Sequence, residues 1–125
     1  MKNVSITAGR ILLGLYFLVP GILKFVAWDL HIDLMEKHGM PFASVLLPIA
    51  ALTQIISSSL ILASRYVAES AFVLAAMITA INFSLHDFWN YSGIEGAHET
   101  QNFVKNLAIM GGMLILGGIN LKNKT

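Results

Sequence analysis

The chain contains no cysteine among its 125 residues. This absence excludes disulfides, thiolate nucleophiles, iron–sulfur clusters held by cysteine and thiolate-bound zinc. If the protein has a redox role, its electrons would therefore be carried by a bound quinone, a haem or a partner protein, and not by the protein's own side chains.

Charged residues are scarce as well. They make up 12% of the chain, where a soluble domain has about 25%, and 56% of the residues are hydrophobic. The net charge is +1, and no basic cluster lies away from the ends of the apolar segments, so nothing indicates a nucleic-acid partner. This composition predicts an integral membrane protein in contact with a lipid bilayer.

Four apolar segments cover residues 8–27, 44–63, 67–86 and 103–121. Each has about 20 residues and spans about 30 Å as a helix, the thickness of a bilayer's hydrocarbon core. Trp28 and Asp29, not small residues, follow the first segment, so we expect it to be retained and not removed as a signal peptide. Short connections predict an all-α, four-helix transmembrane bundle with up-down-up-down order, formed as one domain over residues 1–125.

Two connecting segments lie at the same end of this predicted bundle. Residues 29–42 alternate apolar and acidic residues, which predicts a short interfacial helix ended by Gly39 and Pro41. Residues 90–101 contain two glycines, and we expect them to form a mobile loop.

Lysine and arginine are unevenly shared between the two ends. The end that holds both termini and the 64–66 link carries five basic residues and one acid, which are Lys2, Arg10, Arg65, Lys122, Lys124 and Glu69. The opposite end carries three lysines and six acids. The positive-inside rule therefore predicts that both termini are cytoplasmic, and we call the opposite end the outer face.

Polar side chains within the apolar segments need partners, because hydrocarbon offers none. Thr79, Asn82 and His86 share one helical face, Gln54 lies near the middle of the second segment, and Asn106 lies about one turn into the fourth. One interpretation is a polar seam that binds the carbonyl oxygens of a quinone. The other is a set of interhelical hydrogen bonds, each contributing about 0.6 kcal/mol.

Cations and histidines near the outer face add further candidates. Lys24 either extends to the lipid headgroups, pairs with Asp87 or holds an anion. The histidines, at positions 31, 38, 86 and 98, form no i, i+4 pair, which favours solvated or proton-exchanging side chains over metal or haem ligands. His86 is the exception, since it ends an apolar segment. The candidate ligand-binding residues are Lys24, Gln54, Asn82, His86, Lys105 and Asn106, and no catalytic or metal-ligating residue is predicted.

Several stretches resemble the DoxX family of small four-span bacterial membrane proteins. They are residues 10–14, 21–25, 38–41, 60–65, 77–80, 86, and 105–108 before Gly111-Gly112. The resemblance implies a bacterial inner-membrane location. It also implies either a membrane subunit of a quinone-linked oxidoreductase or a scaffold for soluble redox enzymes. Where the family tends to have Glu followed by paired glycines, this chain has Gln54 and Ser58-Ser59; an amide can hydrogen-bond but cannot release a proton.

Our leading hypothesis is an accessory membrane subunit of a quinone-linked redox or oxidative-stress system. Its quinone-sized pocket would lie at the outer ends of the first, third and fourth segments. There His86 and Asn82 would bind the ligand's oxygens, Lys24 or Lys105 would favour an anionic form, and Gln54 would close the seam. The alternatives are a scaffold that recruits redox-enzyme partners without a ligand, and, more weakly, a small-solute transporter. Paired glycines at 111–112 and 117–118 leave a homo-oligomer open.

Overall fold

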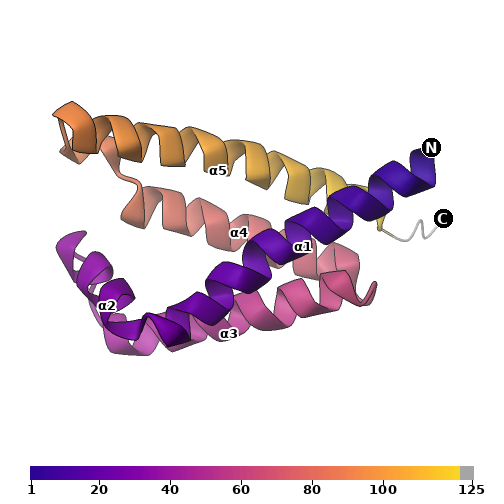
Figure 1. Ribbon diagram of the computed structural model, residues 1–125, viewed down its shortest axis with the longest axis horizontal. Helices are drawn as coiled ribbons and strands as arrows, with labels where there is room; N and C mark the ends of the chain where they lie inside the picture. The colour runs from indigo at the N-terminus through magenta and orange to yellow at the C-terminus, as the bar shows by residue number, and fades with distance from the viewer. Residues whose placement is uncertain (122–125) are drawn as a thin grey trace.

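The computed structural model describes residues 1–121, and its elements are all helical (Figure 1). In chain order they are α1 (Lys2–Val26), α2 (Trp28–Lys37), α3 (Ala43–Leu62), α4 (Val67–Leu85), the 3-10 helix η1 (Phe88–Asn90) and α5 (Gly93–Ile119). The four long helices are each long and apolar enough to cross a membrane. The predicted all-α four-helix bundle is confirmed.

The four long helices are arranged as two closely packed pairs, α1 with α3 and α4 with α5, joined by the α3–α4 contact (Figure 1). The start of α1, the α3–α4 turn and the end of α5 lie at one end, which we call the turn end. The other end, the α2 end, holds α2, η1 and the first turns of α5. Lys122 and Lys124, counted in the charge balance, lie outside the described residues.

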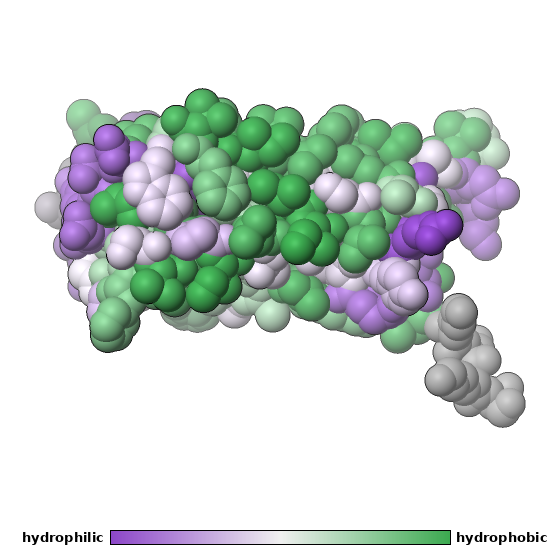
Figure 2. All heavy atoms as spheres, turned by 90° about the horizontal axis from the view of Figure 1, so that it is seen from below, coloured by the Kyte–Doolittle hydropathy of each residue, from purple (hydrophilic) through white to green (hydrophobic). Residues whose placement is uncertain are grey.

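The surface shows a broad hydrophobic belt with hydrophilic side chains gathered at both ends (Figure 2). Many large apolar side chains of the long helices are exposed on it, among them Leu12, Val19, Ile49, Leu52 and Ile115. A soluble protein rarely exposes so large a contiguous apolar area. The belt matches the environment of a bilayer, and the chain is a multi-pass membrane protein.

The backbones of α1 and α3 approach closely because glycines lie between them. A Cβ atom added at Gly14 would lie 2.8 Å from the side chain of Leu62, and one at Gly21 would lie 3.0 Å from that of Ile55. Arg10, one turn before Gly14, donates from Nη1 to the carbonyl oxygen of Ile61 at 2.6 Å and to that of Leu62 at 3.1 Å. Arg10 therefore caps the last turn of α3, where the carbonyl oxygen of Ile61 also accepts from the backbone N–H of Ser64 at 3.1 Å.

Two apolar cores hold the bundle together. The larger core lies toward the turn end and comprises Phe17, Ile61, Val67, Ala71, Leu74, Ala75, Ile78, Met113 and Leu116. The smaller core packs α2 onto α3 and comprises Met35, Ala43 and Leu47, with Trp28, Ile32, Met40 and Leu85 against it. The predicted short helix over 29–42 is thus present as α2, and its chain leaves through Gly39 at a φ of 76°.

The expectation of a mobile loop over residues 90–101 is wrong, because α5 already begins at Gly93. Glu95 in the first turn is favourable near the positive end of the helix dipole. Gly96 lies against the backbone of Tyr91, where an added Cβ would come within 2.9 Å of the carbonyl oxygen. Thr100 donates to the carbonyl oxygen of Gly96 at 2.8 Å. The fourth long helix thus begins ten residues before the predicted 103–121 segment.

Candidate functional site

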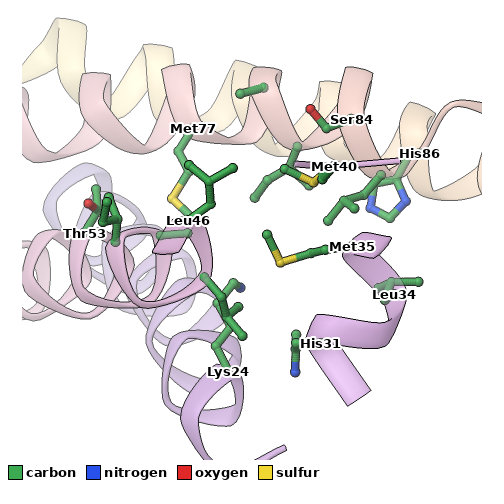
Figure 3. A pocket seen from close by; sticks show the side chains of 16 residues that line it. Lys24, His31, Leu34, Met35, Met40, Leu46, Thr53, Met77, Ser84 and His86 are labelled. Carbon is green, nitrogen blue, oxygen red and sulfur yellow. The ribbon is translucent and has the colours of Figure 1, made fainter. Parts of the chain in front are cut away.

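A cavity of about 440 Å³ lies between α2, α3 and α4, beside the smaller core (Figure 3). Its walls are mostly apolar. Met35 comes from α2, Leu46 and Ala50 from α3, and Met77 and Ile81 from α4. Ligand pockets of small molecules commonly enclose about 300–1,000 Å³ and combine apolar walls with a few polar groups. This cavity has the size and the lining of such a pocket.

Three polar side chains from three different elements gather at the α2 end of this cavity. Lys24 comes from the last turn of α1, His31 from α2, and His86 follows α4 directly. Figure 3 shows the three around Met35. Nδ1 of His31 lies 2.8 Å from the carbonyl oxygen of Ala27, so Nδ1 carries the proton and Nε2 is left as an acceptor.

Of the six residues predicted to bind a ligand, only Lys24 and His86 line the cavity. Lys105 is exposed on α5. The cavity also uses the second apolar segment (α3) where the sequence pointed to the fourth (α5). His31 and Met35 were not among the candidates. The apolar positions of the predicted 29–42 helix are the signal that could have indicated them.

The other three candidates are buried amides that join neighbouring helices. Gln54 Nε2 donates to the carbonyl oxygen of Phe17 at 2.7 Å, between α3 and α1. Asn82 Nδ2 donates to the carbonyl oxygen of Phe103 at 3.1 Å, between α4 and α5. Asn106 accepts from the Tyr16 hydroxyl at 3.3 Å, between α5 and α1. This geometry is that of interhelical hydrogen bonds, the second interpretation offered by the sequence.

A second polar group lies next to the cavity and reaches it through His86. His38, after α2, places Nδ1 2.6 Å from Asp87 Oδ1. Glu99 of α5 places Oε1 3.4 Å from His86 Nδ1 and Oε2 3.5 Å from His38 Nε2. We call His38, His86, Asp87 and Glu99 the His–carboxylate cluster. It joins the loop after α2, the end of α4 and the second turn of α5.

Two groups beside this cluster have shifted pKa values. The pKa of Tyr91 is raised by burial and then by the negative charge of Asp87. The pKa of Lys37 is raised by its hydrogen bond to Glu95 and by the charge of that carboxylate. The Lys37–Glu95 ion pair lies at an exposed position. It connects α2 to α5 in addition to the His–carboxylate cluster.

Four apolar helices, with a cavity between α2, α3 and α4, define a small helical membrane protein. The sequence model of the DoxX family matches residues 5–87, more than half of the chain, and the chain belongs to that family. The match contains every residue that lines the cavity and ends before Glu99. No match was found among curated proteins or among solved structures.

Proposed function

We propose that this DoxX-family protein binds a quinone in the cavity between α2, α3 and α4. In this proposal it serves as an accessory membrane subunit of a quinone-linked redox or oxidative-stress system in the bacterial inner membrane. The observation that carries the proposal is the cavity of about 440 Å³, with apolar walls and with Lys24, His31 and His86 gathered at one end.

The polar groups match the two redox forms of a quinone headgroup. The Lys24 amine donates hydrogen bonds, and so suits the carbonyl oxygens of the oxidised form. Nε2 of His31 is an acceptor, and so suits the hydroxyl of the reduced form. His86 directs Nδ1 to Glu99, which leaves Nε2 for a ligand. The apolar walls would hold the ring and the start of the prenyl tail, with Met77 and Ile81 on the α4 side.

When bound, a quinone carries electrons and protons between redox enzymes, which the cysteine-free side chains do not do. The proposal therefore includes protein partners that reduce and oxidise the quinone. Gly111 and Gly118 have open space beside the position of a Cβ atom, so a second copy of the chain could approach α5 there. Homo-oligomerisation stays a prediction.

The first test is native mass spectrometry of the protein extracted gently from its own membranes. A stoichiometric adduct with the mass of a quinone is expected. Binding is then measured by titrating a short-chain ubiquinone analogue into protein in lipid nanodiscs. Ala50→Trp fills the cavity and should raise the Kd at least about tenfold, which corresponds to about 1.4 kcal/mol. Lys24→Met should weaken binding by several-fold.

Ala76→Trp is the matched control, because Ala76 is exposed on α4 and does not line the cavity. Its quinone affinity should equal that of the unchanged protein. Equal affinity in Ala50→Trp would overturn the cavity assignment. A chain that carries only phospholipid and a co-purifying protein would favour the scaffold alternative.

The location and orientation are tested separately. The positive-inside rule applied to Arg10 and Arg65 puts both termini in the cytoplasm and the polar end of the cavity at the periplasmic side. A reporter that is active only in the cytoplasm, fused after the C-terminus, should be active. The same reporter inserted at Gly39 should be silent. The reverse pattern would contradict the proposed orientation.

A further inference from the structure

His38 is held in a tautomer that suits a metal ligand. Its side chain is only 3% exposed, and Nδ1 lies 2.6 Å from Asp87 Oδ1. The other oxygen of Asp87 accepts from Asn90 Nδ2 at 2.7 Å, so both carboxylate oxygens act as acceptors. The proton between His38 and Asp87 therefore belongs to Nδ1, and Nε2 points elsewhere. Metal-binding histidines commonly donate their second ring nitrogen to a carboxylate in this way.

Nε2 of His38 faces Glu99 Oε2 at 3.5 Å. That oxygen is buried and has no hydrogen-bond partner among residues 1–121. In the neutral tautomer both atoms are acceptors, so this arrangement calls for a positive charge between them. A proton on Nε2 would draw the two atoms to about 2.7–2.9 Å, the length of a charge-assisted hydrogen bond. The observed separation is clearly longer.

The separation fits a metal ion instead. Zinc binds imidazole nitrogen and carboxylate oxygen at about 2.0–2.2 Å with tetrahedral angles, so two of its ligand atoms lie about 3.4 Å apart. His86 Nδ1 lies 3.4 Å from the other oxygen of Glu99. His38 and Glu99 also belong, with Asp87, to a group in which one ligand atom of each residue lies within 4.8 Å of the others; His86 is not in that group and approaches through the second oxygen of Glu99.

We propose that His38, His86 and Glu99 bind a divalent metal ion of the zinc class, with Asp87 as the residue that orients His38. Two imidazole nitrogens and one carboxylate form a donor set that suits zinc, and they leave a fourth position open. The sequence pattern did not indicate this site because its residues come from three separate elements. The ion would fasten the second turn of α5 to the loop after α2 and to the end of α4.

The proposal does not depend on quinone binding, although the two sites share His86. A metal on Nδ1 of His86 would leave its proton on Nε2, where the imidazole becomes a donor toward the cavity. His38 and Glu99 do not line the cavity. Variants at these two positions therefore test the metal site and leave the cavity lining intact.

The test uses the full chain, purified without a histidine tag and stripped of metal. Competition between the protein and a chromophoric chelator measures Zn²⁺ affinity and stoichiometry. The visible absorption of added Co²⁺ reports tetrahedral coordination. One ion per chain is expected. His38→Ala and the nearly isosteric Glu99→Gln should each weaken binding by more than about 100-fold, and Asp87→Asn by about 10–100-fold, the usual effect of losing such an orienting carboxylate.

His98→Ala is the matched control, since His98 is exposed on α5 next to Glu99. It should bind Zn²⁺ like the unchanged protein, and size-exclusion chromatography and circular dichroism check that each variant is folded. The proposal is overturned if the protein takes up no ion, or if a folded Glu99→Gln variant keeps full affinity. An equal loss in His98→Ala, which would indicate adventitious surface binding, overturns it too. Zinc binding without quinone binding would support this metal site and reject the proposed function. Quinone binding without zinc binding would reject the metal site and support the proposed function.

Discussion

Gln54 donates a hydrogen bond from Nε2 to the backbone carbonyl oxygen of Phe17 at 2.7 Å and so joins α3 to α1. Its Oε1 atom is buried without a hydrogen-bond partner in the described part of the chain. The side chain lies where Gly21 leaves room, since a Cβ atom added there would be 3.4 Å from it. Gln54 is therefore a contact between α1 and α3 and does not line the cavity.

We expect Gln54→Met to lower the free energy of unfolding by only about 0.6 kcal/mol, the mean for interhelical hydrogen bonds in membranes. Methionine nearly keeps the volume, and it removes the buried Oε1 that has no partner. Quinone affinity should not change. Detergent-induced unfolding followed by circular dichroism gives the first quantity, and the nanodisc titration gives the second. A tenfold higher Kd for the quinone would instead indicate that Gln54 is part of the ligand site.

Arg10 should stabilise the bundle more than its charge alone would suggest. Arg10→Met removes two charge-assisted hydrogen bonds to the carbonyl oxygens of Ile61 and Leu62. We expect a loss of about 1.5–3 kcal/mol in the free energy of unfolding. Arg65→Met is the matched control, because Arg65 is exposed at the same end and its loss removes the same charge. Equal effects of the two substitutions would show that charge, and not the contact with α3, is what matters.

Gly96 should resist substitution although it lies in a helix. Alanine normally favours a helix over glycine by about 1 kcal/mol. A Cβ atom at position 96, however, would meet the Tyr91 carbonyl oxygen at 2.9 Å, and backbone cannot move aside cheaply. Gly96→Ala should therefore destabilise the protein, by about 1–3 kcal/mol, and loosen the first turns of α5.

Gly118→Ala provides the opposite expectation in the same helix, since a Cβ atom there meets nothing within 4 Å. It should be neutral or stabilising. Hydrogen exchange of the first turns of α5, together with the unfolding midpoint, measures both effects. If Gly96→Ala were as stable as Gly118→Ala, the close contact with Tyr91 would not constrain the start of α5.

The Lys37–Glu95 ion pair should contribute to stability in a pH- and salt-dependent way. The pKa of Lys37 is raised in the folded protein by Glu95. Its contribution is therefore complete below the ordinary lysine pKa of about 10.4 and is lost as the pH rises through the higher folded value. The side chains are 55% and 51% exposed, so salt should screen the pair strongly.

We expect Lys37→Met to lower the unfolding midpoint slightly at pH 8 in low salt. The difference from the unchanged protein should shrink above pH 10.4 and in molar salt. A difference that stays constant across pH and salt would mean that the lysine stem, and not its charge, stabilises the contact between α2 and α5.

The sequence by itself determined the class of protein and its main elements. Hydropathy is a local property of the chain, so the length of the four apolar segments predicted the four long helices, and the 29–42 pattern predicted α2. The up-down order of the four segments also predicted that histidines and acids gather at one end of the bundle. The start of α5 did not follow, because its first turns depend on contacts of Gly96 with Tyr91 and of Glu99 with His38 and His86.

Which polar residues meet was decided only by the tertiary structure. The helices α3 and α4 are apolar on nearly every side, so no amphipathic face shows how each of them is rotated or which helix it pairs with. Packing of α1 on α3 and of α4 on α5 turns Gln54, Asn82 and Asn106 into contacts between helices. The position of α2 across the bundle brings His31 to Lys24 and His86, and the chain that follows it brings His38 to Asp87. These contacts depend on distances between helices in the folded protein, and the spacing of residues along the chain does not predict those distances.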